Sequence, residues 1–209
     1  MNDAPRDSET ESSHTPQSGE LPQSDEQLMV AFARGQADAF TALFARYKQP
    51  LFGFFRRRVT DPAQAEELTQ ETFVALLRAA ARYRPAALFR TYLYSIGFKI
   101  LRAYRRKAAF RAAFLGEQPP GREPAIDSAI ETQALMRQAV GRLEQLDREV
   151  LLLREFEQLS YAEIAGLLGL PLNTVRSRLF RARLALHDLL AAPASHPAAQ
   201  EFAQSKERL

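Results

Sequence analysis

The chain has 209 residues, enough for one domain or two small ones, and a formal net charge of +3. It contains no cysteine, which excludes disulfides, thiolate metal sites and cysteine nucleophiles. No apolar run approaches the roughly 20 residues that cross a bilayer, and the polar, acidic N-terminus is unlike a secretory signal peptide. We therefore expect a soluble, cytoplasmic protein without membrane insertion.

Residues 1–24 are rich in Ser, Glu, Gln and Pro and have no apolar pattern, so we predict a disordered acidic extension. They carry a net charge of −4, which leaves +7 on the rest of the chain. Ordered structure is expected to begin at Asp25. Apolar residues then recur at helical spacing, with Pro50 expected to bend or break the helix. These residues are Phe40, Leu43, Phe44, Tyr47, Leu51 and Phe54.

Two more helices are predicted in the first half of the chain. Asp61-Pro62 is typical of a helix start, with Asp as the N-cap and Pro at the first helical position. This helix is expected to reach about Tyr83, and a third helical segment covers residues 87–114. The first domain is therefore predicted over residues 25–114.

A change in composition separates this domain from the rest. Residues 116–124 (GEQPPGREP) cannot hold a regular element, so we place a flexible linker at residues 115–129. A helical pattern resumes over residues 130–190, and residues 191–209 form a weakly ordered tail. No strand-like alternation is seen along the sequence. The predicted fold is all-α, with two small helical domains.

Charges of opposite sign lie on neighbouring helices of the first domain. The helix that starts at Asp61 carries Glu66, Glu67 and Glu71. Residues 78–116, which begin in the last part of this helix, contain ten Lys or Arg, eight Tyr or Phe and no Asp or Glu. A cationic, aromatic segment favours nucleic acid, whereas an acidic helix favours a protein partner because carboxylates repel DNA. The acidic residues could instead simply complement the helix dipole.

The basic segment has one apolar face and several candidates for a nucleic-acid surface. Leu93, Ile96 and Ile100 share a face and are expected in the core. Tyrosines beside cations can stack on unpaired bases, although each could equally line the core with its hydroxyl at the rim. The candidate nucleic-acid residues are Arg90, Tyr92, Lys99, Arg102, Arg105 and Arg106.

The second domain has the pattern of a helix-turn-helix. Ser160 and Glu163 form a capping box, and Gly169 suits the left-handed turn after a short helix. On the next helix Val175, Leu179, Ala182 and Leu186 would pack inward. The opposite face and its flanks suit base edges and phosphates in a major groove, although a solvated basic face is the simpler alternative. The candidates are Asn173, Thr174, Arg176, Ser177, Arg178, Phe180, Arg181 and Arg183.

Three segments together resemble the two-domain sigma factors of bacterial RNA polymerase, of the extracytoplasmic-function (ECF) type. Residues 65–73 (AEELTQETF) resemble the polymerase-binding motif of region 2, and residues 89–96 (FRTYLYSI) resemble its promoter-melting segment. Residues 159–165 (LSYAEIA) and 173–183 (NTVRSRLFRAR) resemble the helix-turn-helix of region 4. The match covers about residues 25–190 in the order of the family.

The resemblance implies a role for each segment. The first would bind core RNA polymerase, the second would grip and open the downstream (minus-ten) element, and the recognition helix would read the upstream (minus-thirty-five) element of promoter DNA. It also implies an anti-sigma factor as partner, with no cofactor and no catalytic residue. The implied polymerase-binding residues are Glu66, Glu67, Leu68, Gln70, Glu71 and Phe73.

Some positions depart from the pattern of the family. Its members usually have Trp where Tyr92 stands, Asn where Lys99 stands and Asp where Ala103 stands, and Asn173 replaces a common Gly. These departures imply unusual or relaxed recognition of the downstream element. A dimeric helix-turn-helix repressor remains an alternative, which polymerase binding would discriminate. An enzyme is unsupported, because the three histidines lie outside any recognisable catalytic constellation.

Overall fold

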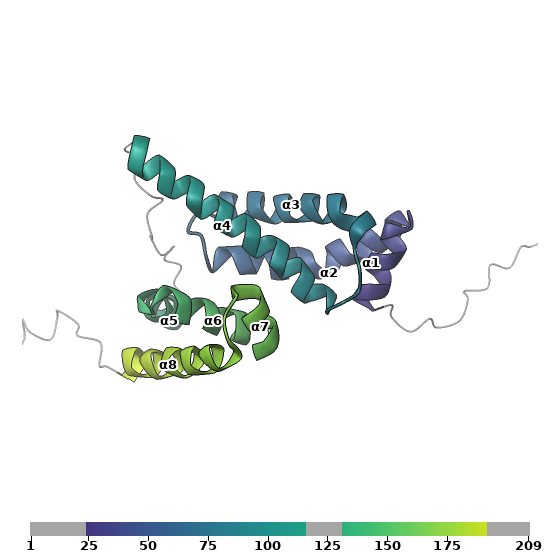
Figure 1. The fold of residues 1–209 in the computed structure, drawn as a ribbon. Helices are drawn as coiled ribbons and strands as arrows, with labels where there is room; N and C mark the ends of the chain where they lie inside the picture. Colours follow the sequence, from purple (N-terminus) through teal and green to yellow (C-terminus); the bar gives the residue numbers. More distant parts are fainter. Residues whose placement is uncertain (1–23, 116–130, 192–209) are drawn as a thin grey trace, which may run out of the picture.

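The computed structural model describes residues 24–115 and 131–191, which form helices and no strand. Figure 1 shows two lobes, and we call α1–α4 the first lobe and α5–α8 the second lobe. The all-α expectation is confirmed for the described residues, while residues 1–23, the linker predicted at 115–129 and the tail fall largely or wholly outside them. The elements are α1 (Asp25–Ala33), α2 (Ala37–Arg56), α3 (Pro62–Ala79), the 3-10 turn η1 (Ala80–Arg82), α4 (Phe89–Leu115), α5 (Glu131–Arg142), α6 (Gln145–Glu155), α7 (Tyr161–Leu168) and α8 (Leu172–Ala191).

Local capping sets the helix starts of the first lobe. Ser24 and Gln27 form a capping box, and α1 begins at Asp25. The Asp61 side chain accepts a hydrogen bond from the Ala63 N–H at 2.9 Å, with Pro62 at the first position of α3. The predicted caps therefore form.

Pro50 does not break the second helix. It lies inside α2, which continues from Ala37 to Arg56. Proline removes one backbone hydrogen bond, but Leu51, Phe54 and Phe55 beside it are fully buried and hold the helix against the core. Packing of this apolar face therefore outweighs the local cost, and the expectation of a break is wrong.

The core of the first lobe is rich in aromatic rings. Phe73 on α3 packs against Phe44 with ring centroids 4.8 Å apart and edge-on against Phe40 at 6.2 Å. Leu93 on α4 is completely buried, as its helical face predicted, whereas Ile96 and Ile100 are only half-buried. These contacts fix the outward faces of α3 and α4.

The second lobe is a helix-turn-helix built on α6. Ser160 and Glu163 cap α7 reciprocally, and Gly169 ends it with φ +69°, which a residue with a side chain adopts reluctantly. On α8 Val175, Leu179 and Ala182 are buried. The predicted inward face is confirmed at these three positions, while Leu186 is half-buried.

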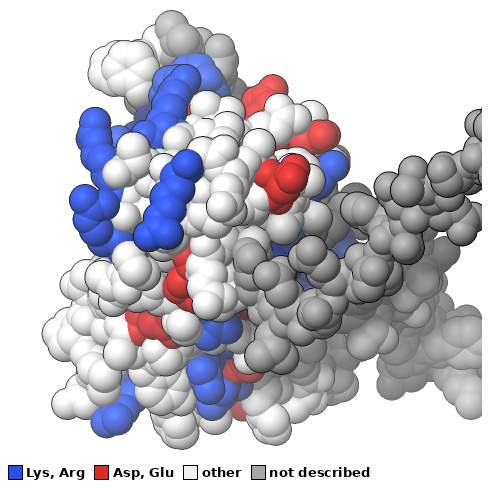
Figure 2. All heavy atoms as spheres, turned by 90° about the vertical axis from the view of Figure 1, so that its right-hand side faces the viewer, with Lys and Arg blue, Asp and Glu red and all other residues white. Residues whose placement is uncertain are grey.

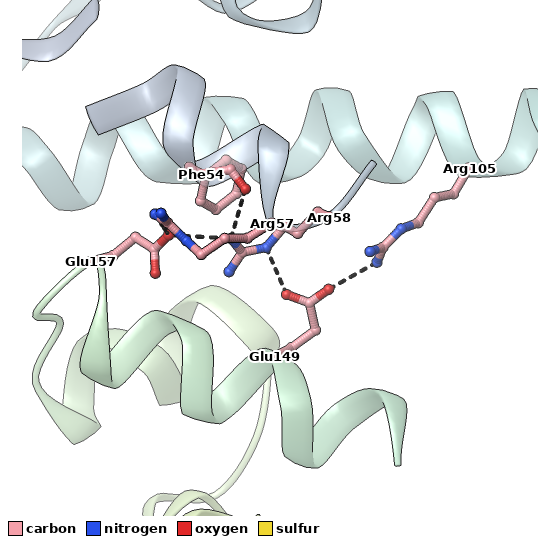
Figure 3. A network of polar contacts seen from close by, with 6 residues as sticks. All are labelled: Phe54, Arg57, Arg58, Arg105, Glu149 and Glu157. Atoms are coloured by element: carbon pink, nitrogen blue, oxygen red, sulfur yellow. Dashed lines mark hydrogen bonds and ion pairs between the residues drawn. The ribbon is translucent and has the colours of Figure 1, made fainter. Parts of the chain in front are cut away.

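The lobes lie against each other in this structure. Charged side chains from the end of α2 and from α4 meet carboxylates of α6 and of the loop after it (Figure 3). At α7, the Thr91 hydroxyl of α4 also donates a hydrogen bond to Glu163. The two domains expected from the sequence are thus present, but they are in direct contact.

Candidate nucleic-acid and protein interfaces

An acidic stripe runs along the exposed side of α3. Glu66, Glu67, Gln70 and Glu71 are all exposed, and their spacing places them on one side of the helix. Farther along the same helix, Val74 and Leu77 expose about two fifths of their surface, at 41% and 40%. We call these six residues the α3 stripe. It combines carboxylates with an apolar end, as a protein-binding surface does.

Two residues implied in polymerase binding do not belong to this surface. Leu68 and Phe73 are buried, with 3% and 4% of their surface exposed. Phe73 is held between Phe40 and Phe44, so it positions α3 and offers nothing to a partner. Phe73 was implied only by the resemblance to the family motif, and the sequence of the helix does not show which of its apolar residues the core covers.

The basic candidates of α4 divide between two faces. Lys99, Arg102 and Arg106 are exposed and follow helical spacing, and Tyr92 lies half-buried on the same face. We call these four residues the outer face of α4. Figure 2 shows Lys and Arg gathered along one side of the first lobe, apart from its acidic side chains.

Tyr92 is neither a core residue nor a free ring. Its ring packs against Tyr83 at a centroid distance of 5.1 Å, and burial raises its pKa. Tyr94, by contrast, is buried beside Phe54, and burial raises its pKa to about 12. Tyr94 therefore lies in the core, as the alternative interpretation of the tyrosines expected, whereas Tyr92 is only partly buried.

The other two basic candidates face the second lobe. The Arg105 guanidinium donates a hydrogen bond to Glu149 at 3.0 Å. Arg90 is half-buried, and it lies close enough to Glu163 to help lower the pKa of that carboxyl. Burial alone would raise the pKa of Glu163, but hydrogen bonds from Thr91 and Ser160 outweigh it. Arg90 and Arg105 are thus less accessible than the outer face.

An exposed aromatic pair near the end of α4 was missed by the sequence analysis. Phe110 and Phe114 expose most of their surface, and their ring centroids are 4.6 Å apart. Phe110 continues the spacing of Lys99, Arg102 and Arg106 along the helix. Phe110 follows Arg106 by four residues, and this helical spacing could have placed Phe110 on the outer face of α4 from the sequence alone.

Helix α8 presents the predicted recognition face. Asn173, Arg176, Ser177 and Arg181 are exposed, and the Phe180 ring stands out with 69% of its surface accessible. Thr174 is half-buried beside them. An aromatic ring this exposed on a folded lobe serves no packing purpose within that lobe, which favours contact with a partner.

The flanking arginines of α8 are tied to α6. Arg178 donates to Glu144 at 2.6 Å and to Asp147 at 2.7 Å, and the bond to Asp147 raises the pKa of Arg178. Arg183 pairs with Glu155 at 2.6 Å. Both were assigned to phosphate contacts from their place on the helix. In this structure they instead hold α8 on α6.

Comparison with known proteins agrees with this division into lobes. Residues 43–110 match Sigma-70 region 2, and residues 133–186 match Sigma-70, region 4. The RNA polymerase sigma-H factor of Pseudomonas aeruginosa is 30% identical over 187 residues, which cover 79% of this chain and 93% of that protein. The RNA polymerase sigma factor YlaC of Bacillus subtilis is 32% identical over 160 residues, or 71% and 90% of the two chains.

Solved structures show the same fold. The structure of CnrH in complex with the cytosolic domain of CnrY has a TM-score of 0.62 at 29% identity, and the match covers 81% of this chain and 99% of that chain. RpoE of Bartonella quintana, solved with the anti-sigma factor NepR, has a TM-score of 0.61 at 21% identity over 74% of this chain and 98% of that one. Within the described residues, no helix is both long and apolar enough to span a bilayer.

Proposed function

The chain belongs to the sigma-70 family and is an initiation factor of the ECF type that directs RNA polymerase to promoters, and from this premise we propose which surface performs each step. The α3 stripe binds core polymerase, the outer face of α4 engages the opened downstream element, and the exposed face of α8 reads the upstream element. One observation carries this assignment. The exposed carboxylates of the α3 stripe lie on a different helix from the exposed cations of the outer face of α4 and of the recognition face of α8, in the order that region 2 and region 4 require.

The α3 stripe suits a protein partner rather than DNA. Glu66, Glu67 and Glu71 would repel phosphates, whereas cationic side chains of a protein partner would bind these exposed carboxylates. Val74 and Leu77 extend the stripe with the apolar contact that a stable interface needs near its centre. Leu68 and Phe73 contribute by holding the helix in place.

The outer face of α4 suits a separated strand. Lys99, Arg102 and Arg106 can follow the phosphates, and the accessible part of Tyr92 can stack on an unpaired base. Each stacked base contributes roughly 1–3 kcal/mol, which favours the open strand over the duplex. Lys99 and Ala103 stand where the family usually has an amide and a carboxylate, so base preference in this element is relaxed.

The exposed face of α8 suits a duplex. Arg176 can donate two parallel hydrogen bonds to a guanine, and Asn173 can do the same with an adenine. Phe180 can contact a thymine methyl. Ser177 and Arg181 complete the set of groups that reach base edges or nearby phosphates.

The cellular location and the protein partner that we propose follow from the same assignment. RNA polymerase works in the cytoplasm, so this chain acts there and needs no catalytic residue of its own. CnrH, at 29% identity, was solved with the cytosolic domain of CnrY. A protein partner that binds this chain, an anti-sigma factor, is part of the proposal.

The test is transcription in vitro with purified core polymerase on genomic fragments. Glu67→Lys should abolish co-purification with core polymerase while DNA binding by the isolated chain persists. Asp188→Lys makes the same change of charge at an exposed position of α8 and should leave co-purification unchanged. If the wild-type chain neither binds core polymerase nor starts transcription, the helix-turn-helix repressor is the better assignment.

A further inference from the structure

Two exposed phenylalanines lie side by side near the end of α4. Phe110 and Phe114 expose 60% and 73% of their surface. Their ring centroids are 4.6 Å apart and their planes differ by 31°, so the rings form a nearly parallel pair. The last turns of α4 project beyond the neighbouring helices of the first lobe (Figure 1), and the core of the described residues does not reach these rings. Large apolar groups exposed together in this way indicate a surface for a partner.

Helix geometry places this pair on the same side of α4 as the outer face. Phe110 follows Tyr92 by 18 positions, which is five complete turns of about 3.6 residues, so both rings leave the helix in the same direction. Lys99 and Arg106 lie between them on this side, and both are exposed. At 1.5 Å per residue, the two rings are about 27 Å apart along the helix axis. The face therefore has aromatic rings toward both ends and cations between them.

The charge around the pair favours an anionic partner. Arg106 and Lys107 are exposed within about one turn of Phe110, and α4 contains no carboxylate over its whole length. A second copy of the chain would bring the same cations against these, and their repulsion opposes such a contact. Phosphates, in contrast, would neutralise the cations. The charge therefore points to nucleic acid as the occupant of this surface.

The rings favour an unpaired base over a duplex. A free base has two flat faces that can stack on an aromatic side chain, and this contact tolerates any base. In a duplex the neighbouring base pairs already cover these faces. The exposed fractions of Phe110 and Phe114 leave room for a base to join the pair as a third stacked ring. Cations followed by exposed rings are the combination that binds a separated strand.

We propose that Phe110 and Phe114 form a second stacking platform on α4, which holds an unpaired base of the opened promoter strand in addition to the base at Tyr92. This inference rests on the function proposed for the outer face of α4. The separation of about 27 Å corresponds to roughly eight nucleotides at 3.4 Å each. A strand must be open over about this length to reach both sites, so the platform favours a long unpaired segment over a short one.

The first test measures how affinity depends on the length of the strand. Labelled oligo(dT) of five and of ten nucleotides is titrated with the full chain, and fluorescence anisotropy reports binding. The gain in affinity from five to ten nucleotides should be at least about fivefold larger in wild type than in F110L/F114L, which is the lower limit for one stacked base. The matched control F110Y/F114Y keeps the aromatic rings and should retain the gain.

Leucine distinguishes stacking from apolar contact. F110L/F114L keeps the apolar surface and every cation, so a gain equal to that of wild type would overturn the platform. The salt dependence of binding to the ten-nucleotide strand should be the same in wild type and both variants, because the phosphate contacts are unchanged. A shallower salt dependence in F110L/F114L would mean that the loss arises from displaced cations, which would also overturn the proposal.

The second test observes the platform directly. The chain contains no tryptophan, so F110W introduces a single indole whose fluorescence is quenched when a base stacks on it. The ten-nucleotide strand should quench F110W and leave the control T41W, at an exposed position of α2, unchanged. An unquenched F110W that still binds the strand would overturn the proposal. So would an indole already shielded from acrylamide in the free chain, because another segment or a second copy would then cover the pair.

The outcomes separate this proposal from the function on which it rests. If wild type does not bind the ten-nucleotide strand, the assignment of the outer face of α4 fails together with the platform. If wild type binds it and F110L/F114L shows the same gain with length, the platform alone fails. Neither measurement uses polymerase, so transcription with core enzyme tests the initiation function independently.

Discussion

Replacing Arg176 or Arg178 of α8 by alanine should impair different properties of the protein. Arg176 is exposed, and its guanidinium donates a long hydrogen bond of 3.5 Å to Asn173 on its own helix. Arg178 is bound to both Glu144 and Asp147 on α6. We expect Arg176→Ala to weaken DNA recognition without loss of stability, and Arg178→Ala to destabilise the second lobe.

The magnitudes follow from these contacts. A hydrogen bond between charged groups contributes about 1.5–3 kcal/mol, and the pair with the exposed Glu144 adds at most about 1 kcal/mol. Without Arg178, the largely buried Asp147 side chain keeps one ion pair among the described residues, with Arg181 at 3.5 Å. Arg178→Ala should therefore cost about 2–3 kcal/mol of unfolding free energy. Arg176→Ala should change stability by less than about 0.5 kcal/mol but cost roughly 1–3 kcal/mol of specific DNA binding.

Hydrogen exchange separates the two effects, because it reports opening of one lobe at a time. Arg178→Ala should speed exchange of the α6 and α8 amides and leave α1–α4 unchanged. Electrophoretic mobility shifts on a selected upstream element measure the loss of affinity. An Arg178→Ala variant with unaltered exchange and weaker binding would refute the structural assignment of Arg178 and restore it as a phosphate contact.

Three further predictions concern the first lobe. Phe73→Ala should lower the unfolding free energy by about 3–5 kcal/mol in urea titrations, whereas the exposed Leu77→Ala should change it little while weakening polymerase binding. Gly97→Ala should stabilise α4 by about 0.5–1 kcal/mol, because the added methyl meets Phe55 at an ordinary 3.4 Å. The Phe89 N–H bond lowers the pKa of Glu26 below 4.5, so its stabilisation is full above that pH and disappears as pH falls through the lowered pKa. Thermal unfolding of Glu26→Gln should therefore depend less on pH in the acid range than that of wild type.

Features that depend on neighbouring residues could be read from the sequence. The caps at Asp61 and Ser160 and the left-handed turn at Gly169 are set within a few residues, and all three form as predicted. The inward face of α8 followed from spacing alone. The sequence predicts these features because the interactions that stabilise them join residues only a few positions apart.

Features that depend on distant residues could not be read. The continuity of α2 through Pro50 depends on a core assembled from other helices. Nothing around Phe73 shows that Phe40 and Phe44 will cover it. The carboxylate partners of Arg105 and Arg178 lie 44 and 31 residues away in sequence. Arg105 therefore binds across the two lobes and Arg178 binds within the second lobe, although the two residues look alike in the sequence.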